Sequence, residues 1–454
     1  MKKYFNSYWF RSAYYSFLQR FSLTLFGLAN FMLLVRLLSI NEMGAWALFL
    51  TITTLFENTK TGLLKNAHIK FASGSVAAKA KYEIASSSLL VNLGISLFFI
   101  LLILTFGKGL AGLLNAGNDM VTLLIWFIPG LVAMVFFSHF EAVQQSHFDF
   151  KGVFAGGLAR QMCFFLCLVI HFLLDIPVTM LLLGLYQSTC VIIGTVVLYL
   201  YSKKYLAHRF TPTKEWIKKM LGYGGYIFGS NVVSSIFANI EQFLTASYLS
   251  AGSVAYYNSA KRINGFIDIP TYAAADIAFP KMAQASAIEG VDKVKYIYEK
   301  MVAALLSVII PAAIFAIIFP KFIIRIIAGE AYITAAPILQ LYMLISIIGT
   351  PQHQAATSLY SIGKTKLCFY LNILSLVIKS GVTYLCLLFF GFYGAAVGAL
   401  ITSFLIIVIW YFPLKREIGL TLSNIPLYMR EYYLNAYRFL RKAVTGRAKA
   451  STAE

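Results

Sequence analysis

The residues best suited to chemistry are polar side chains inside a long apolar stretch, 252–280. A series spaced by three or four residues shares one face of a helix: Asn258, Lys261, Gly265, Asp268 and Tyr272. At membrane depth such a polar face must turn toward protein or water, because lipid satisfies no polar group. Ionisable groups there are functional candidates by default. We therefore expect Asp268 to bind a coupling cation or proton.

Two adjacent cations, Lys261 and Arg262, are the candidates for attracting an anionic substrate. Lysine and arginine both bind phosphate oxygens, so a diphosphate fits them. Arg262 lies about 100° around the helix from Lys261, which follows from 3.6 residues per turn. Arg262 is therefore the weaker candidate. The alternative is that Lys261 and Asp268 take part in a buried interhelical ion pair that only fixes helix packing.

The other intramembrane charges are scattered over three further apolar stretches. Glu57 and Lys60 are three residues apart, a spacing at which a helical pair can neutralise itself. Lys379 has no acidic neighbour on its own helix and must find a partner elsewhere or face water. Glu241 lies in the outer half of its helix. We take Lys60 and Lys379 as further cleft cations, and Glu57 and Glu241 as further cleft carboxylates.

Enzyme chemistry is not indicated by any motif in the chain. No glycine-rich phosphate loop with lysine, His-Glu-x-x-His pair or nucleophile elbow is present. Cys163, Cys167 and His171 share one helical face, but the outer two are two turns apart, too far to hold one ion comfortably. We therefore expect no catalytic residues, no metal site and no cofactor.

The elements that position these residues are membrane-spanning helices. The composition is 59% hydrophobic and 12% charged, against about 25% charged in soluble proteins. Apolar runs of roughly 20 residues recur along the chain. The predicted spans are 17–38, 44–66, 84–106, 120–144, 153–174, 178–201, 223–248, 252–280, 300–319, 335–360, 367–390 and 393–412. The predicted fold class is an all-α polytopic membrane protein with about twelve transmembrane helices.

The positive charges set the expected orientation. With a cytoplasmic N-terminus, most of the 38 Lys and Arg fall on the cytoplasmic side, and only Lys108, Lys321 and Arg325 fall outside. Cytoplasmic loops are the ones enriched in these residues. Both termini are therefore predicted to be cytoplasmic. The net charge of +20 then indicates contact with anionic lipids rather than with nucleic acid.

An internal repeat organises the chain into domains. An offset of 211 residues carries Leu38-Ser39 onto Leu249-Ser250 and Glu57 onto Asp268. Six spans separate the copies, so the halves run the same way, as in parallel transporter repeats. The expected domains are two six-helix bundles related by a pseudo-two-fold axis, a basic linker and a basic amphipathic tail. The two bundles occupy residues 1–201 and 222–412. The linker, 202–221, joins them, and the tail, 413–454, follows the second bundle.

Several segments resemble the polysaccharide flippases of the multidrug/oligosaccharidyl-lipid/polysaccharide exporter superfamily. The resemblance lies in helix ends and turns, and its motifs keep their order along nearly the whole chain. They are RLLSINEMGAWALF (36–49), YLSAGSVAYYNSAKRI (248–263), AFPKMAQ (278–284), GEAYITAAPILQ (329–340), GKTK (363–366) and YGAAVGA (393–399). Members of this family often have Asp where this chain has Glu241.

The resemblance implies two six-helix bundles and the flipping of an undecaprenyl-diphosphate-linked oligosaccharide across an inner membrane. The product would be O-antigen, capsule or exopolysaccharide. The implied mechanism is alternating access coupled to H⁺ or Na⁺, with polysaccharide polymerase machinery as a partner. Two alternatives stay open: a multidrug or peptidoglycan-precursor exporter of the same superfamily, and a membrane-embedded glycan polymerase or ligase. The last would need a sizeable extracytoplasmic loop, and the loops expected there are short.

The charge asymmetry yields a topology prediction. A reporter that is active only outside the cytoplasm is expected to stay silent when fused after Lys214 and to be active after Gly117. Enzyme activity of the two fusions in whole cells measures this. The opposite pattern would reverse the predicted orientation.

Overall fold

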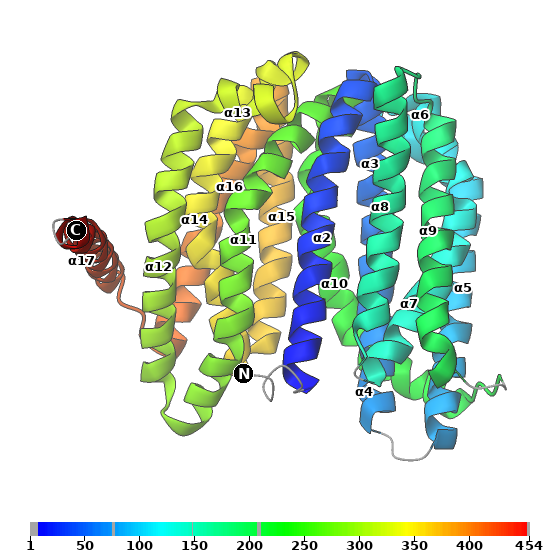
Figure 1. Cartoon of the computed structure of the whole chain (residues 1–454), viewed down its shortest axis with the longest axis horizontal. Coiled ribbons are helices and arrows are strands. Elements are labelled where there is room, and N and C mark those ends of the chain that lie inside the picture. Colours follow the sequence, from blue (N-terminus) through cyan, green and yellow to red (C-terminus); the bar gives the residue numbers. More distant parts are fainter. Residues whose placement is uncertain (1–7, 75–77, 148, 207–209, 452–454) are drawn as a thin grey trace. The chain divides into compact units, whose positions relative to one another are not determined.

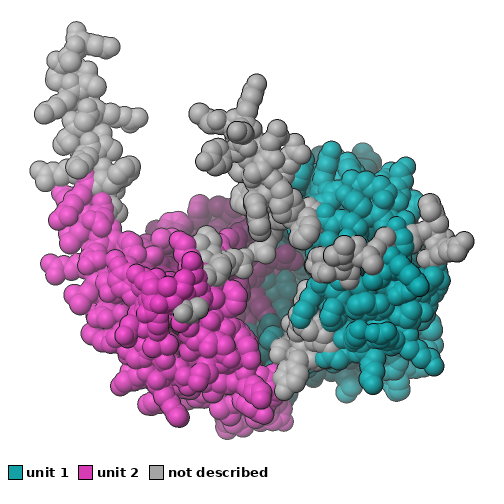
Figure 2. Space-filling view, turned by 90° about the horizontal axis from the view of Figure 1, so that it is seen from below, with its two compact units in different colours: residues 1–258 teal, residues 259–454 magenta. Residues whose placement is uncertain are grey.

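The computed structural model describes residues 8–74, 78–147, 149–206 and 210–451, and these residues form helices without any strand (Figure 1). Helices dominate because each span must satisfy its own backbone hydrogen bonds in lipid. Contacts between elements divide the chain into two compact units, residues 1–258 and residues 259–454 (Figure 2). We call them unit 1 and unit 2.

Unit 1 contains the helices from α2 to α10 and the first residues of α11. Their bounds are α2 Tyr8–Leu37, α3 Ile40–Lys60, π-helix η1 Thr61–Lys65, α4 Asn66–Gly74, α5 Ala78–Leu113, α6 Gly117–Trp126, α7 Ile128–Ser146, α8 Lys151–Leu174, α9 Met180–Ser202, 3₁₀-helix η2 Lys203–Tyr205 and α10 Lys214–Tyr248. Within it, α8 packs against both α2 and α9, and α7 packs against α5 and α9.

Unit 2 contains the remainder of α11 and the helices that follow. Their bounds are α11 Ala251–Ile288, α12 Val291–Ile318, α13 Pro320–Ile327, η3 Glu330–Ala335, α14 Ala336–Ser361, α15 Thr365–Phe390, η4 Gly391–Tyr393, α16 Gly394–Ile418 and α17 Asn424–Ser451. Here α14 packs against α12 and α16, and α15 packs against α16.

The all-α fold class predicted from the sequence is confirmed, and each predicted span coincides with a helix or a pair of successive helices. Among the described residues, six helical segments are long and apolar enough to cross a membrane, and a bent pair makes a seventh. Helices α3 and α11 lie outside that set. Both carry the intramembrane charges noted above, including Glu57 and Lys60 on α3 and Lys261, Arg262 and Asp268 on α11.

One span is broken where the sequence predicted a single helix over 120–144. Helices α6 and α7 meet at Phe127 with a bend of 47°. Pro129 lies in the first turn of α7 and has no N–H to donate to the preceding turn. The Phe127 N–H still bonds to the Leu123 carbonyl at 3.0 Å, so the chain turns without losing that bond.

The unit boundary falls inside α11, whereas the sequence placed the start of the second bundle at residue 222. Helix α10 clusters with unit 1 because it is tied to helices there. Thr51 of α3 donates to Gln242 at 2.6 Å, and Asn115 donates to the carbonyls of Ala246 and Ser247 at 3.1 and 2.9 Å. The predicted bundles were defined by the order of the spans along the chain, whereas units 1 and 2 are defined by contacts. The contact units therefore do not test the predicted bundle limits, which stay a prediction.

The proposed repeat is supported by helix ends. The offset of 211 carries Leu37, the last residue of α2, onto Tyr248, the last residue of α10. It also carries Ile40 onto Ala251, which are the first residues of α3 and α11. The two turns therefore have the same length.

These equivalent helix starts also touch. A Cβ added to Gly44 would lie 1.8 Å from the Ala251 carbonyl oxygen, and one added to Gly252 would lie 2.4 Å from Asn41 Oδ1. Only glycine allows so close an approach of α3 to α11. Asn41 and Gly252 are themselves equivalent under the offset, so the contact joins two equivalent positions of the proposed repeat.

Hydrogen bonds attach the basic linker to the rest of unit 1. Ser86 and Ser87 of α5 accept from the N–H groups of Thr211 and Thr213 at 3.1 and 3.0 Å. Asp149 accepts from Lys204 Nζ at 3.0 Å and from the Tyr205 hydroxyl at 3.1 Å. Burial alone would raise the pKa of the Asp149 carboxyl, but these bonds together hold that pKa below its ordinary value.

The basic tail predicted after the last span contains helix α17, Asn424–Ser451. Glu299, which is 1% exposed, holds its start: the carboxylate accepts from the Thr421 N–H at 3.0 Å and from Asn424 Nδ2 at 2.8 Å. The Tyr433 hydroxyl donates to the Ser307 carbonyl at 3.0 Å. The first turns of α17 are therefore anchored to α12.

The α3–α11 contact predicts a stability effect. Gly44→Ala is expected to destabilise the protein by about 2 kcal/mol, because the added methyl group meets rigid backbone. The thermal midpoint of the detergent-purified protein measures this. Gly94→Ala on α5 is the matched control, since nothing lies within 4 Å of its added Cβ. Equal midpoints for the two variants would contradict the close approach.

Candidate functional site

Asp268 lies at the centre of a polar network that joins α11 to α14 within unit 2. Asn264 Nδ2, one turn earlier on α11, donates to Asp268 Oδ2 at 2.7 Å. The Ser346 hydroxyl of α14 lies 2.7 Å from Asp268 Oδ1 and 2.8 Å from Asn264 Oδ1. Asn264 and Ser346 are 7% and 4% exposed, so the network is enclosed by protein. We call these three residues the Asp268 triad.

The triad contains three short contacts but too few protons when Asp268 is ionised. The Ser346 hydroxyl has one proton and faces two oxygen acceptors, and an ionised carboxylate only accepts. One oxygen–oxygen contact is then left without a hydrogen. If Asp268 carries a proton on Oδ1, it donates to Ser346, which donates to Asn264. All three contacts are then hydrogen bonds, so the geometry fits the protonated carboxyl.

The polar face continues along the same two helices. Gln354 Nε2 donates to the Thr271 carbonyl at 2.8 Å, and the Thr271 and Thr350 hydroxyls lie 3.5 Å apart. The rings of Tyr272 and His353 meet edge to face, with centroids 4.8 Å apart. Tyr272 is 55% exposed. Side chains of α14 therefore supply partners for part of the polar face predicted on α11. This face reaches the surface of unit 2 at Tyr272.

The predicted cations of unit 2 occupy different environments. Lys261 and Arg262 on α11 are both half-buried. The polar contacts described for Asp268 are those of the triad. Lys379 on α15 is 8% exposed. It shares with Ser375 the buried face of α15, where Ser375 accepts from Trp410 Nε1 of α16 at 3.2 Å.

The Glu57–Lys60 ion pair predicted on α3 is formed. Lys60 Nζ lies 2.8 Å from Glu57 Oε1, and the two side chains are 3% and 23% exposed. Lys60 Nζ also lies 4.7 Å from the centroid of the Phe56 ring, which stacks on Phe99 of α5. The lysine is therefore held by a carboxylate and an aromatic face together.

A second pair near it was not predicted. Lys65 Nζ of η1 lies 2.7 Å from Glu141 Oε1 of α7. Arg160 of α8 interacts electrostatically with both Glu57 and Glu141, and its guanidinium donates to Met134 Sδ at 3.4 Å. Lys65 falls at the end of the predicted span 44–66, whereas Arg160 lies seven residues inside the span 153–174 and on a different helix from Glu57 and Glu141. The sequence therefore gave little reason to group them with Glu57.

The remaining candidates lie on α10 and at the start of α11, both within unit 1. Glu241 is 4% exposed and lies beside Gln242, whose amide oxygen accepts from Thr51. Asn258 is half-buried, one turn before Lys261. Neither is part of the Asp268 triad. The structure thus distributes the predicted residues over several networks.

The Cys-Cys-His face considered on α8 does not form a cluster of those three residues. His171 Nε2 is 2.8 Å from the Tyr186 hydroxyl, and Nδ1 is 3.1 Å from the Ile176 carbonyl. Cys163 and Cys167 instead meet Cys190 of α9, with the three sulfur atoms within 4.8 Å of one another. The thiols are packed into the α8–α9 interface, where Cys190 is 1% exposed.

Comparisons with known proteins give a consistent family and fold. A family model described as "Polysaccharide biosynthesis protein" matches residues 33–337, more than half of the chain. A curated relative, a putative O-antigen transporter of Shigella flexneri, is 21% identical over 182 residues. That match covers 40% of this chain and 43% of the relative, so the chain aligns with less than half of the relative's length.

Two solved structures share the fold, each at 15% identity and a TM-score of 0.76. One is an inward-facing multidrug resistance MATE family transporter of the MOP superfamily, covering 87% of this chain and 94% of that chain. The other is the lipid II flippase MurJ in an inward closed conformation, covering 93% and 91%. Identity this low shows the fold alone, and it is the fold of multi-pass membrane transporters.

The α3 ion pair predicts a test of whether Lys60 is structural. Lys60→Met is expected to destabilise the protein by about 1–3 kcal/mol, because it leaves a largely buried carboxylate unpaired. The double variant Glu57→Gln with Lys60→Met should recover most of this loss. Thermal midpoints in detergent measure both.

A matched control removes an exposed pair. Lys219 lies 2.6 Å from Glu215, with side chains 50% and 73% exposed. Lys219→Met should change stability by less than about 1 kcal/mol. No recovery in the double variant would show that Lys60 does more than neutralise Glu57.

Proposed function

Since the chain belongs to the polysaccharide biosynthesis protein family, we propose that it is a flippase for a lipid-linked oligosaccharide. The substrate is an undecaprenyl-diphosphate-linked oligosaccharide destined for O-antigen, capsule or exopolysaccharide. The O-antigen transporter relative and the lipid II flippase fold support this substrate class. The membrane is the inner membrane, with both termini cytoplasmic, and the partners include the polymerase that uses the flipped glycan.

The observation that carries the mechanism is the Asp268 triad. Its hydrogen-bond geometry is complete only when the carboxyl carries a proton. Loss of that proton leaves two oxygens facing each other at less than 3 Å, which favours a rearrangement of α11 against α14. We therefore assign H⁺ rather than Na⁺ as the coupling ion of alternating access. Asp268 binds and releases it, and Ser346 and Asn264 respond to it.

In this proposal the cationic side chains bind the negatively charged diphosphate of the substrate. A diphosphate must leave bulk water to cross, and a cation in a low-dielectric site binds it more strongly than one in water. Lys261 and Arg262 serve this role on α11, two turns from Asp268 along the same helix. Lys60 and Lys379 are the secondary cations, since the first already has a carboxylate partner and the second lies on a buried face.

The test uses purified protein in vesicles loaded with an undecaprenyl-diphosphate-linked oligosaccharide. Flipping is measured by the access of an added glycosidase, with a proton gradient or a sodium gradient imposed. The wild type should respond to the proton gradient alone. Asp268→Asn should reduce flipping at least about tenfold, which corresponds to 1.4 kcal/mol. Its thermal midpoint should stay near that of the wild type, because an amide can complete the triad as the protonated acid does.

Control variants show whether an effect is specific to Asp268 and Lys261 or follows from any change of charge. Asp292→Asn, at an exposed position of α12, should leave flipping unchanged. Lys261→Ala should reduce flipping and Lys261→Arg should retain much of it. If Lys261→Ala with Asp268→Ala restores flipping, Lys261 serves structure and not substrate. Sodium-driven flipping by the wild type, or normal flipping by Asp268→Asn, would contradict proton coupling. Export of a drug without any glycan flipping would favour the multidrug alternative.

A further inference from the structure

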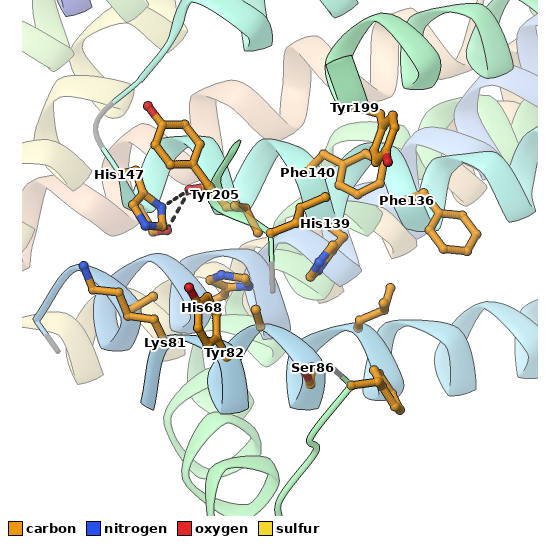
Figure 3. A pocket seen from close by; sticks show the side chains of 17 residues that line it. His68, Lys81, Tyr82, Ser86, Phe136, His139, Phe140, His147, Tyr199 and Tyr205 are labelled. Carbon is orange, nitrogen blue, oxygen red and sulfur yellow. Dashed lines mark hydrogen bonds between the residues drawn. The ribbon is translucent and has the colours of Figure 1, made fainter. Parts of the chain in front are cut away.

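A pocket of about 340 Å³ lies in unit 1, apart from the Asp268 triad and the Glu57–Lys60 pair (Figure 3). Its lining comes from α4, α5, α7, α9 and the chain just after α9. Tyr82, Phe136 and Tyr199 line it and are themselves 40%, 36% and 44% exposed, so the pocket opens on the surface of the protein. Its volume lies within the range of about 300–1,000 Å³ typical of small-molecule sites.

The lining is ordered from polar to aromatic. Lys81, His147 and Tyr205 lie toward one end, whereas Phe136 and Tyr199 lie toward the other (Figure 3). The polar end coincides with the start of α5 and the end of α7, beside the chain that follows α9. Phe136 lies eleven residues before His147 on α7, roughly 16 Å deeper by helix rise. The polar end therefore meets the membrane interface, and the aromatic end reaches hydrocarbon depth.

Two buried imidazoles occupy the middle of this pocket. His68 and His139 are 1% and 7% exposed, and their ring centroids are 5.9 Å apart. Within the described residues, the Nδ1 atom of neither ring has a hydrogen-bond partner. His147 differs, because its Nδ1 lies 2.9 Å from the Val143 carbonyl. Buried polar atoms without partners are rare in proteins, so the Nδ1 atoms of His68 and His139 call for a group that none of the described residues supplies.

We propose that this pocket binds one anionic glycerophospholipid of the surrounding leaflet. The headgroup phosphate contacts Lys81 and His147, the glycerol ester carbonyls accept from His68 and His139, and one acyl chain lies against Phe136 and Tyr199. The order of groups along the lipid matches the order of side chains along the pocket. A neutral imidazole carries one N–H donor, which suits an ester carbonyl.

The ester region decides between this lipid and an isoprenoid carrier. An undecaprenyl phosphate also offers a charge and an apolar chain, but its chain begins directly at the phosphate. It places no acceptor at the depth of His68 and His139. The proposed site is therefore separate from the transported substrate, and it stands whether or not the proposed function holds.

Native mass spectrometry of the detergent-purified full chain tests the proposal. The probes are dioleoyl phosphatidylglycerol, its dialkyl ether analogue, which lacks ester carbonyls, and undecaprenyl phosphate. The ester lipid should bind more tightly than either of the others. Lys81→Ala should weaken its binding about fivefold, the effect of one lysine at an anionic interface. His139→Phe should reduce the difference between ester and ether lipids while retaining the pocket's shape, because His68 alone then donates to an ester carbonyl.

Lys79→Ala is the matched control, because Lys79 lies two residues from Lys81 with its side chain 90% exposed. It should bind the ester lipid as the wild type does. The Lys81→Ala comparison is independent of His139→Phe, so it tests the site even if the latter variant fails to fold. Equal binding of ester and ether lipids by the wild type, or tighter binding of undecaprenyl phosphate, would overturn the proposal. Equal weakening by Lys79→Ala would do the same.

Discussion

A hydrocarbon interior offers no water to its polar groups, and the internal bonds of this chain follow from that constraint. Several polar side chains on spanning helices meet a partner on another helix. Ser346 crosses from α14 to Asp268, and Trp410 crosses from α16 to Ser375. Gln144 of α7 donates to Ser202 of α9 at 2.9 Å. These bonds fix helix rotation, since turning any of these helices by half a turn would place a polar group in lipid.

The same solvent weakens the hydrophobic effect between helices, so close packing must replace it. Small residues supply that packing in both units. A Cβ on Gly156 of α8 would lie 2.9 Å from the Gly194 carbonyl of α9, and the reverse distance is also 2.9 Å. In unit 2, Gly398 of α16 approaches the Thr383 backbone, with 2.8 Å to an added Cβ. Backbones that come this close leave the larger side chains free to face lipid.

The sequence predicted what depends on local pattern. Apolar runs of span length locate the helices, and spacing on one helix predicts the Glu57–Lys60 pair and the polar face of α11. It did not predict contacts between residues far apart in the chain. Ser346 is an ordinary hydroxyl 78 residues from Asp268, and nothing in its surroundings marks it as a partner. Likewise, His68 and His139, whose Nδ1 atoms have no hydrogen-bond partner among the described residues, come from separate helices that only the fold brings together.

The contact between Asn41 and Gly252 has an evolutionary meaning if the chain arose by duplication. Under the offset of 211 these two positions are one position in an ancestral half, so the ancestor would have met its own copy there across a symmetry axis. One side chain could not then be both asparagine and glycine. The present pair became distinguishable only after both halves were joined in a single gene. Fusion therefore allowed an asymmetric junction, with a side chain on α3 filling the space that its counterpart on α11 leaves empty.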